Sequence, residues 1–148
     1  MKPITAVIPF LSKASTSEAV KLLDTSRLIE KIFTYSGSSQ DSNSKTDFNV
    51  KNILSSSAIK QIARSVKTEY LLFQFQHLEV HLEKFSLERM LLAASQSGAS
   101  MVYSNYLVLK DGITQEHPTI DYQIGSIRDD FDFGPIVLIN SKLLLNTA

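Results

Sequence analysis

YLLFQF, residues 70–75, is the strongest strand signal in the chain, and the rest of the fold is predicted from it. A short run that is almost wholly apolar indicates a strand buried on both faces of a sheet. A similar run, ITAVIPF at residues 4–10, ends near a proline, and residues 28–35 regain strand character. The sequence therefore predicts a sheet whose central strands are covered on both sides.

Helical signals separate these strands. Ser15 and Glu18 have the spacing of a capping box, and apolar residues follow at helical intervals. Three serines at 55–57 offer N-caps to a second helix with one apolar face. Residues 85–97 form a third predicted helix, and Gly98 lies where a left-handed C-cap is wanted.

The remaining elements are predicted from weaker patterns. Residues 48–53 suggest a third, less apolar strand, and 101–109 (MVYSNYLVL) a further one that ends at the Asp111-Gly112 turn. Residues 136–139 form the last predicted strand, followed by a short helix capped by Ser141.

Strands that alternate with helices predict an α/β fold in one domain of 148 residues. We expect a three-layer α/β/α arrangement with a mainly parallel sheet, right-handed crossovers and helices on both faces. Ligands of such sheets bind beyond the carboxyl ends of the strands. The loops after residues 10, 35, 75 and 109 are therefore the places to look for function.

Composition excludes several classes of protein. The chain has no cysteine, which removes disulfides, thiolate metal sites and cysteine nucleophiles. Its 15 basic and 15 acidic residues are interspersed, and because no basic stripe forms we predict no nucleic-acid partner. No apolar run approaches the roughly 20 residues of a membrane span. Pro3 and Pro9 interrupt the N-terminal apolar run, so no signal peptide is predicted and we expect a cytoplasmic protein.

Five segments taken in chain order carry a family resemblance: IPFL at 8–11, YSGS at 35–38, EYLLF at 69–73, ASMVYSNY at 99–106 and DYQIGSIRDDFDFG at 121–134. In this series the chain resembles the family 2 glycosyltransferases with the nucleotide-diphospho-sugar transferase (GT-A) fold. The last segment is the most specific and is similar to a signature of a bacterial subgroup. The resemblance covers the first half to two thirds of a typical catalytic domain, so we expect a truncated member.

The resemblance implies a nucleotide-diphospho-sugar donor, a sugar or glycan acceptor, and a divalent cation, Mg²⁺ or Mn²⁺, on the diphosphate. It also implies a catalytic base downstream, usually in an acidic pair. This chain departs from the family at two places. Tyr35 and Ser36 replace the acidic pair that reads uracil and ribose, and Gln76 and His77 replace the acids that hold the cation.

The resemblance assigns eleven residues to donor binding and one to the metal. The donor-binding residues are Pro9, Phe10, Leu11, Ser36, Gly37, Ser38, Asn105, Arg128, Asp129, Asp130 and Asp132, and the metal ligand is His77. Structural alternatives stand beside each group. Pro9 also suits a strand terminator, the polar tract 36–44 suits a solvated loop, and Arg128 also suits a pair with a neighbouring acid.

Residues 77–83 alternate between polar and apolar. If the segment is extended, its four polar side chains share one face; they are His77, Glu79, His81 and Glu83. Two imidazoles and two carboxylates are compatible with a metal site. The same alternation is typical of a half-exposed strand that turns its polar side to water.

Two functional hypotheses follow. The first is the donor-binding portion of a glycosyltransferase in glycan or polysaccharide synthesis. The second is a non-catalytic remnant or interaction domain that has kept the sheet and lost donor and metal chemistry. A truncated sheet also exposes apolar surface, so self-association into a homo-oligomer is predicted near residues 143–145.

Overall fold

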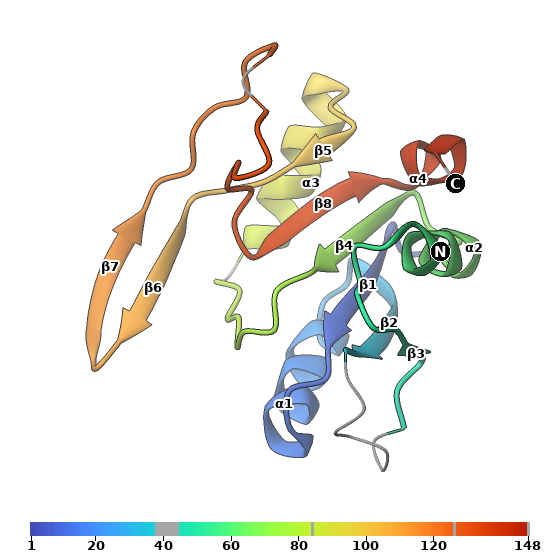
Figure 1. Cartoon of the computed structure of the whole chain (residues 1–148), viewed down its shortest axis with the longest axis horizontal. Helices are drawn as coiled ribbons and strands as arrows, with labels where there is room; N and C mark the ends of the chain where they lie inside the picture. The colour runs from blue at the N-terminus through green and yellow to red at the C-terminus, as the bar shows by residue number, and fades with distance from the viewer. Residues whose placement is uncertain (38–44, 84, 126, 148) are drawn as a thin grey trace.

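The computed structural model spans residues 1–148 and describes all of them except 38–44, 84, 126 and 148 (Figure 1). Within the described residues the chain is a mixed α/β protein with a six-stranded sheet, a separate two-stranded sheet and four helices. This confirms the predicted α/β class. None of the helices in this part of the chain is long and apolar enough to cross a membrane.

Helices separate most of the described strands in the first two thirds of the chain, and only the second and third of these strands follow each other directly. In order the elements are β1 (Ile4–Pro9), α1 (Lys13–Asp24), β2 (Ile29–Ser36), β3 (Phe48–Asn49), α2 (Ser56–Ser65), β4 (Tyr70–Gln74), α3 (Ser86–Ser97), β5 (Met101–Val102), β6 (Tyr106–Lys110), β7 (Ile113–His117), β8 (Ile136–Asn140) and α4 (Ser141–Thr147). The weak strand predicted at 48–53 is thus reduced to the two residues of β3.

The main sheet has the strand order β3-β2-β1-β4-β8-β5. The pairs β3–β2, β2–β1 and β1–β4 are parallel, so the prediction of a mainly parallel sheet is confirmed. Strand β8 is antiparallel to both β4 and β5. The reason is its entry point: Ile136 begins β8 opposite Gln74, at the carboxyl end of β4, so β8 must run back the other way.

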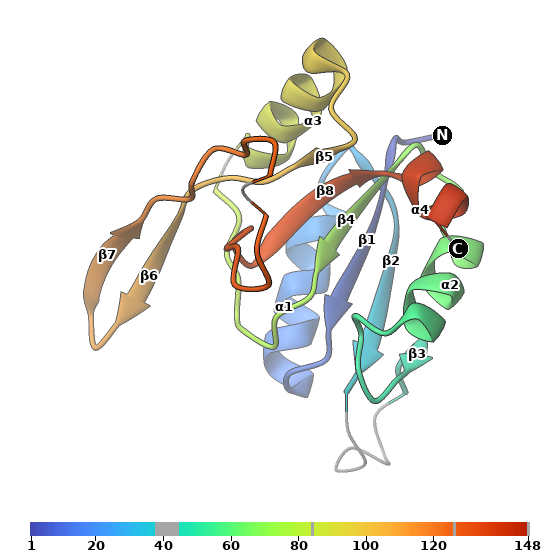
Figure 2. The same ribbon diagram turned by 45° about the horizontal axis from the view of Figure 1, so that its top comes forward.

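Alternate side chains of the strands enter two apolar clusters on opposite faces of the sheet. On β1, Val7 belongs to one cluster, and Ile4, Ala6 and Ile8 belong to the other. Helices α2 and α4 contribute to the Val7 cluster, whereas α1 and α3 contribute to the Ile4 cluster. The arrangement of these helices around the strands can be followed in Figure 2.

Helix ends agree with the predictions in part. Ser55 caps α2 by accepting the Ala58 amide at 3.3 Å, and Gly98 ends α3 with φ of 67°, both as predicted. The capping box at Ser15 is wrong, because Ser12 has the extended backbone of an N-cap and accepts the Ser15 amide. At α4 the side chain of Asn140, not that of Ser141, accepts an amide of the first turn, from Lys142 at 3.0 Å.

The prediction of a single strand at 101–109 is wrong, because the segment is divided between β5 and β6. The chain leaves the main sheet after β5, and β6 pairs with β7 in a hairpin that stands apart from the sheet in Figure 1. The turn predicted at Asp111-Gly112 is confirmed, with φ of 52° and 77° as a tight hairpin turn requires. Strand β7 was not predicted.

Candidate functional site

The carboxyl edge of the parallel strands contains a topological switch point. Strand β1 lies between β2 and β4, so the chain leaves β1 toward one side and later returns on the other. The three strands end at Pro9, Ser36 and Gln74, each within one residue of the position opposite the end of β1. A crevice at such a point is where open α/β sheets bind ligands.

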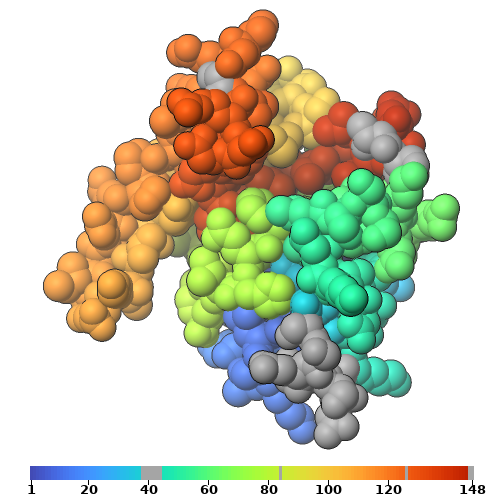
Figure 3. All heavy atoms as spheres, viewed as in Figure 1, coloured from blue at the N-terminus to red at the C-terminus, as the bar shows by residue number. Residues whose placement is uncertain are grey.

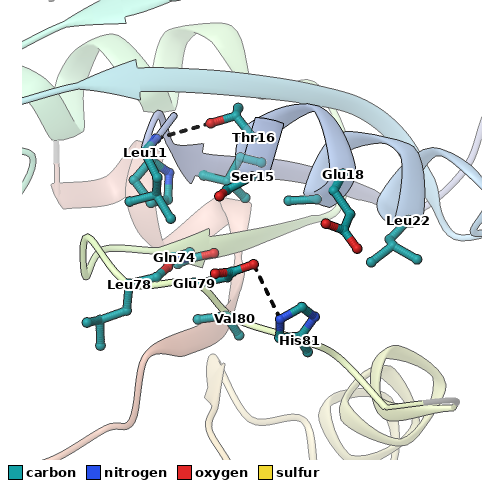
Figure 4. A pocket seen from close by; sticks show the side chains of 13 residues that line it. Leu11, Ser15, Thr16, Glu18, Leu22, Gln74, Leu78, Glu79, Val80 and His81 are labelled. Carbon is teal, nitrogen blue, oxygen red and sulfur yellow. Dashed lines mark hydrogen bonds and ion pairs between the residues drawn. The ribbon is translucent and has the colours of Figure 1, made fainter. Parts of the chain in front are cut away.

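A small pocket opens at this switch point, between α1 and the segment that follows β4. It is lined by Ile8, Pro9, Leu11, Ser15, Thr16, Glu18, Ala19, Leu22, Gln74, Leu78, Glu79, Val80 and His81. Figure 4 shows Glu18 facing Glu79 and His81 across it. The cavity volume is about 20 Å³, roughly the room for one water, so it admits a functional group and not a whole sugar nucleotide.

The first strand end brings two predicted residues to this pocket. Pro9 and Leu11 line it, and the Leu11 amide donates to Thr16 Oγ1 at 3.1 Å. Phe10 lies between them, and its amide donates to the Tyr35 carbonyl at 2.7 Å. These bonds fix the loop after β1 against α1 on one side and β2 on the other.

Tyr35 and Ser36, predicted to stand in place of an acidic pair, form their hydrogen bonds inside the protein. Tyr35 is fully buried and its hydroxyl donates to the Gln74 carbonyl at 3.1 Å. Burial raises the pKa of the Tyr35 hydroxyl well above its ordinary value. Ser36 is 5% exposed and its hydroxyl shares a hydrogen bond of 3.1 Å with that of Thr46. Both hydroxyls therefore bond to protein atoms, and neither side chain faces the solvent at the sheet edge.

The buried tyrosine makes stability depend on alkaline pH. Because the folded pKa of Tyr35 is raised, its contribution to stability is complete below about pH 10 and is lost progressively as the pH rises above that value. Urea unfolding measured from pH 8 to pH 11 should show this fall. Tyr35→Phe should make the fall shallower, whereas Tyr122→Phe, at a side chain 53% exposed, should leave it unchanged. Equal slopes in all three proteins would contradict the assignment.

Gly37 and His77 lie against each other at the ends of β2 and β4. A Cβ atom on Gly37 would be 3.0 Å from His77 Cε1 and 3.2 Å from Nε2, so only glycine lets the imidazole approach this closely. The His77 ring also meets the Tyr35 ring edge-on, with 5.3 Å between centroids. Ser38, predicted beside Gly37, lies outside the described residues.

The segment after β4 is irregular and does not continue as a strand. Its four alternating polar side chains are exposed; they are His77, Glu79, His81 and Glu83. Val80 and Leu82 pack against the Ile4 cluster, to which α1 and α3 contribute. Glu79 Oε1 lies 3.5 Å from His81 Nε2. Among the described residues no group of three or more histidines and acids is placed to hold a metal ion.

The remaining predicted residues lie beyond β5. Arg128 Nε is 3.7 Å from Asp130 Oδ1, and both side chains are 81% exposed, as is typical of a weak surface pair. Asp129 is exposed beside them. Asn105 Oδ1 accepts the Thr119 amide at 2.8 Å and its hydroxyl at 2.9 Å. Asn105 therefore ties together the two ends of the β6–β7 hairpin.

The structure thus divides the predicted donor site into two groups. Pro9, Phe10, Leu11, Ser36, Gly37 and His77 lie at the ends of β1, β2 and β4, and Asn105, Arg128, Asp129, Asp130 and Asp132 lie beyond β5. Residues 128–132 lead into β8, which is adjacent to β4 and three strand spacings from β2, on the order of 14 Å. Figure 3 shows the yellow-green segment after β4 next to the orange chain that leads into β8.

A cluster that was not predicted as a unit joins three of these elements. Tyr106 and His117 stack with 4.7 Å between ring centroids and 16° between planes. The Tyr106 hydroxyl donates to Asp132 Oδ2 at 2.9 Å, and His117 Nδ1 lies 3.5 Å from the same oxygen. Burial, then the hydrogen bond to Asp132, raises the pKa of Tyr106. The sequence held one signal for this cluster, the Asp111-Gly112 turn. A hairpin with a two-residue turn at these positions places Tyr106 opposite His117.

Comparison with known proteins adds no family. No protein-family model matches the chain, and neither curated proteins nor solved structures give a significant match.

Proposed function

We propose that the chain is the donor-binding portion of a glycosyltransferase with a GT-A-like, three-layer α/β/α arrangement. The observation that carries the proposal is the switch point between β1 and β4. There Pro9, Leu11 and His77, which the sequence had marked from separate segments, come to one edge of the sheet. Two apolar clusters, each with helices from its own face, are compatible with the layers.

The two groups of predicted residues suit an elongated ligand. A nucleotide-diphospho-sugar whose base lies at the ends of β1 and β2 would extend along the carboxyl edge toward β8 and β5. Arg128, with an exposed guanidinium, is then available to the diphosphate as a forked donor. Asp129 and Asp130 offer carboxylates to sugar hydroxyls.

The cation implied by the family fits these residues poorly. Mg²⁺ and Mn²⁺ prefer several oxygen ligands, and the described surroundings of His77 are a glycine and a tyrosine ring. The proposed donor site therefore binds its ligand through protein groups alone.

A second function, a non-catalytic remnant or interaction domain, is favoured by one observation. Tyr35 and Ser36 stand where the family reads base and ribose, and both side chains bond internally. Two further expectations stay predictions. One is self-association through α4, where Leu145 is 60% exposed, and the other is a cytoplasmic location.

Titration with UDP-sugars separates the two functions. With ¹⁵N-labelled protein, Mg²⁺ and UDP-glucose or UDP-N-acetylglucosamine, donor binding should shift amides at 10, 11, 37, 77 and 128–132. Arg128→Ala should weaken binding about tenfold or more, because a charge-assisted hydrogen bond contributes about 1.5–3 kcal/mol. Arg27→Ala, an exposed arginine before β2, removes the same charge and should have no effect. A spectrum that does not move with any donor would favour the remnant.

A further inference from the structure

We propose that His117, held by Asp132, is the general base of this chain and accepts the proton of the acceptor hydroxyl during sugar transfer. The inference rests on the proposed function, since it requires a bound sugar donor. It goes beyond that function because the resemblance places the family's base in a downstream acidic pair, whereas this base lies within the described residues.

Two neighbours orient the imidazole of His117, the Asp132 carboxylate and the Tyr106 ring. Nδ1 of His117 faces Asp132 Oδ2 at 3.5 Å, so Nε2 on the other side of the ring is the atom presented to a ligand. A carboxylate at Nδ1 favours the tautomer with its proton there and leaves a lone pair on Nε2. The stack on Tyr106 fixes the plane of the ring, and the His117 side chain is 49% exposed.

Both carboxylate oxygens of Asp132 accept hydrogen bonds from the protein. Its Oδ1 accepts the Gly134 amide at 2.7 Å, and its Oδ2 accepts the Tyr106 hydroxyl at 2.9 Å. Asp132 Oδ2 also lies 3.5 Å from His117 Nδ1, so the carboxylate fixes Tyr106, His117 and the start of the Gly134 loop together. Asp132 is therefore a positioning residue, and the imidazole is the group left to take a proton.

Asp132 lies shortly before β8, which begins at the carboxyl end of β4. Gly134 precedes by two residues Ile136, which pairs with Gln74 at the carboxyl end of β4. Asp132 and the base of the hairpin consequently lie beside the edge where the donor is proposed to bind. A Cβ atom on Gly134 would be 3.3 Å from Tyr106 Cδ1, so the loop and the hairpin are packed together there.

In the proposed transfer, His117 takes the proton that the acceptor hydroxyl loses. An acceptor hydroxyl gives its proton to Nε2 as its oxygen forms a bond to the anomeric carbon of the donor sugar. The bond between that carbon and the diphosphate oxygen breaks, and the nucleoside diphosphate leaves with the electron pair. Water replaces the acceptor in the same step when no acceptor is present, which yields free sugar.

Release of nucleoside diphosphate to water tests the assignment without knowledge of the acceptor. We would incubate the full chain with UDP-glucose, UDP-N-acetylglucosamine, GDP-mannose or dTDP-glucose and follow release by ³¹P NMR. His117→Phe keeps an aromatic ring on Tyr106 and should lower release about a hundredfold or more. His117→Ala should lose release equally and regain part of it with added imidazole. Glu116→Gln, on the neighbouring residue of β7, should release at the wild-type rate.

The outcomes are distinct for the two proposals. Release that is lost in both His117 variants and rescued by imidazole supports the base, because a merely structural role would not respond to imidazole. Release that persists in His117→Phe overturns it, and so does a donor that shifts the amide spectrum but is never hydrolysed. No binding of any donor overturns the proposed function itself.

Discussion

Replacing Tyr35 by alanine should lower the free energy of unfolding by about 3–5 kcal/mol, as for other large aromatic residues truncated in a core. The side chain is fully buried in the cluster on the α2–α4 side of the sheet. Its hydroxyl also satisfies the Gln74 carbonyl, and the truncation would leave that acceptor without its donor. Chemical denaturation monitored by circular dichroism measures the loss.

Tyr35→Phe is the matched control. It keeps the ring in the core and removes only the hydroxyl, so the expected cost is about 1 kcal/mol. Because this hydroxyl points inward, Tyr35→Phe should also leave the titration with UDP-glucose unchanged. A Tyr35→Phe protein that is as stable as wild type but no longer binds donor would show that the hydroxyl reads the ligand, against the geometry seen here.

The sheet and its helices could be predicted largely because their signals are local. YLLFQF and ITAVIPF are short apolar runs, and both become central strands, β4 and β1. Ser55 and Gly98 were found because a cap depends on a few adjacent residues. Ser12 was missed because Ser15 and Glu18 also have the spacing of a capping box. Only the backbone conformation shows that Ser12, and not Ser15, is the N-cap.

The last third of the chain could not be predicted from local patterns. The direction of β8 depends on where the chain re-enters the main sheet. That point is set by the long segment between β5 and Gly134, whose described residues lie outside the main sheet. MVYSNYLVL is one β-prone run, yet it is divided between two sheets. The division occurs where Tyr103 packs edge-on against Phe131 and Phe133, contacts that join residues about thirty positions apart.

The candidate site was predictable to the same extent as the strands that carry it. Parallel strands end at one edge, so the meeting of Gly37 and His77 follows from β2 and β4 being close in one sheet. The two-residue alternation of β2 also places Tyr35 on the same face as Phe33, inside the core. The stack of Tyr106 on His117 required the β7 strand, whose polar sequence gave little apolar signal.

Gly134 offers the second large effect, because its substitution acts on both the backbone and the proposed base. Its φ of 74° is left-handed, and a Cβ atom would lie 3.3 Å from the Ser104 carbonyl oxygen and from Tyr106 Cδ1. We expect Gly134→Ala to cost about 2–3 kcal/mol, of which the left-handed backbone accounts for roughly 1–2 kcal/mol. The crowding should also move Tyr106 and disturb its hydrogen bond to Asp132.

Gly125→Ala separates the two contributions. Gly125 has a similar φ of 84°, but a Cβ atom there would meet nothing within 4 Å. Its cost should therefore be the backbone part alone, roughly 1–2 kcal/mol. Urea denaturation gives both values, and the ring resonances of Tyr106 and His117 report the displacement, which only Gly134→Ala should cause. Equal costs with unmoved rings would mean that the loop before β8 is not packed against the hairpin, and that His117 lacks the support from which its role as a base was inferred.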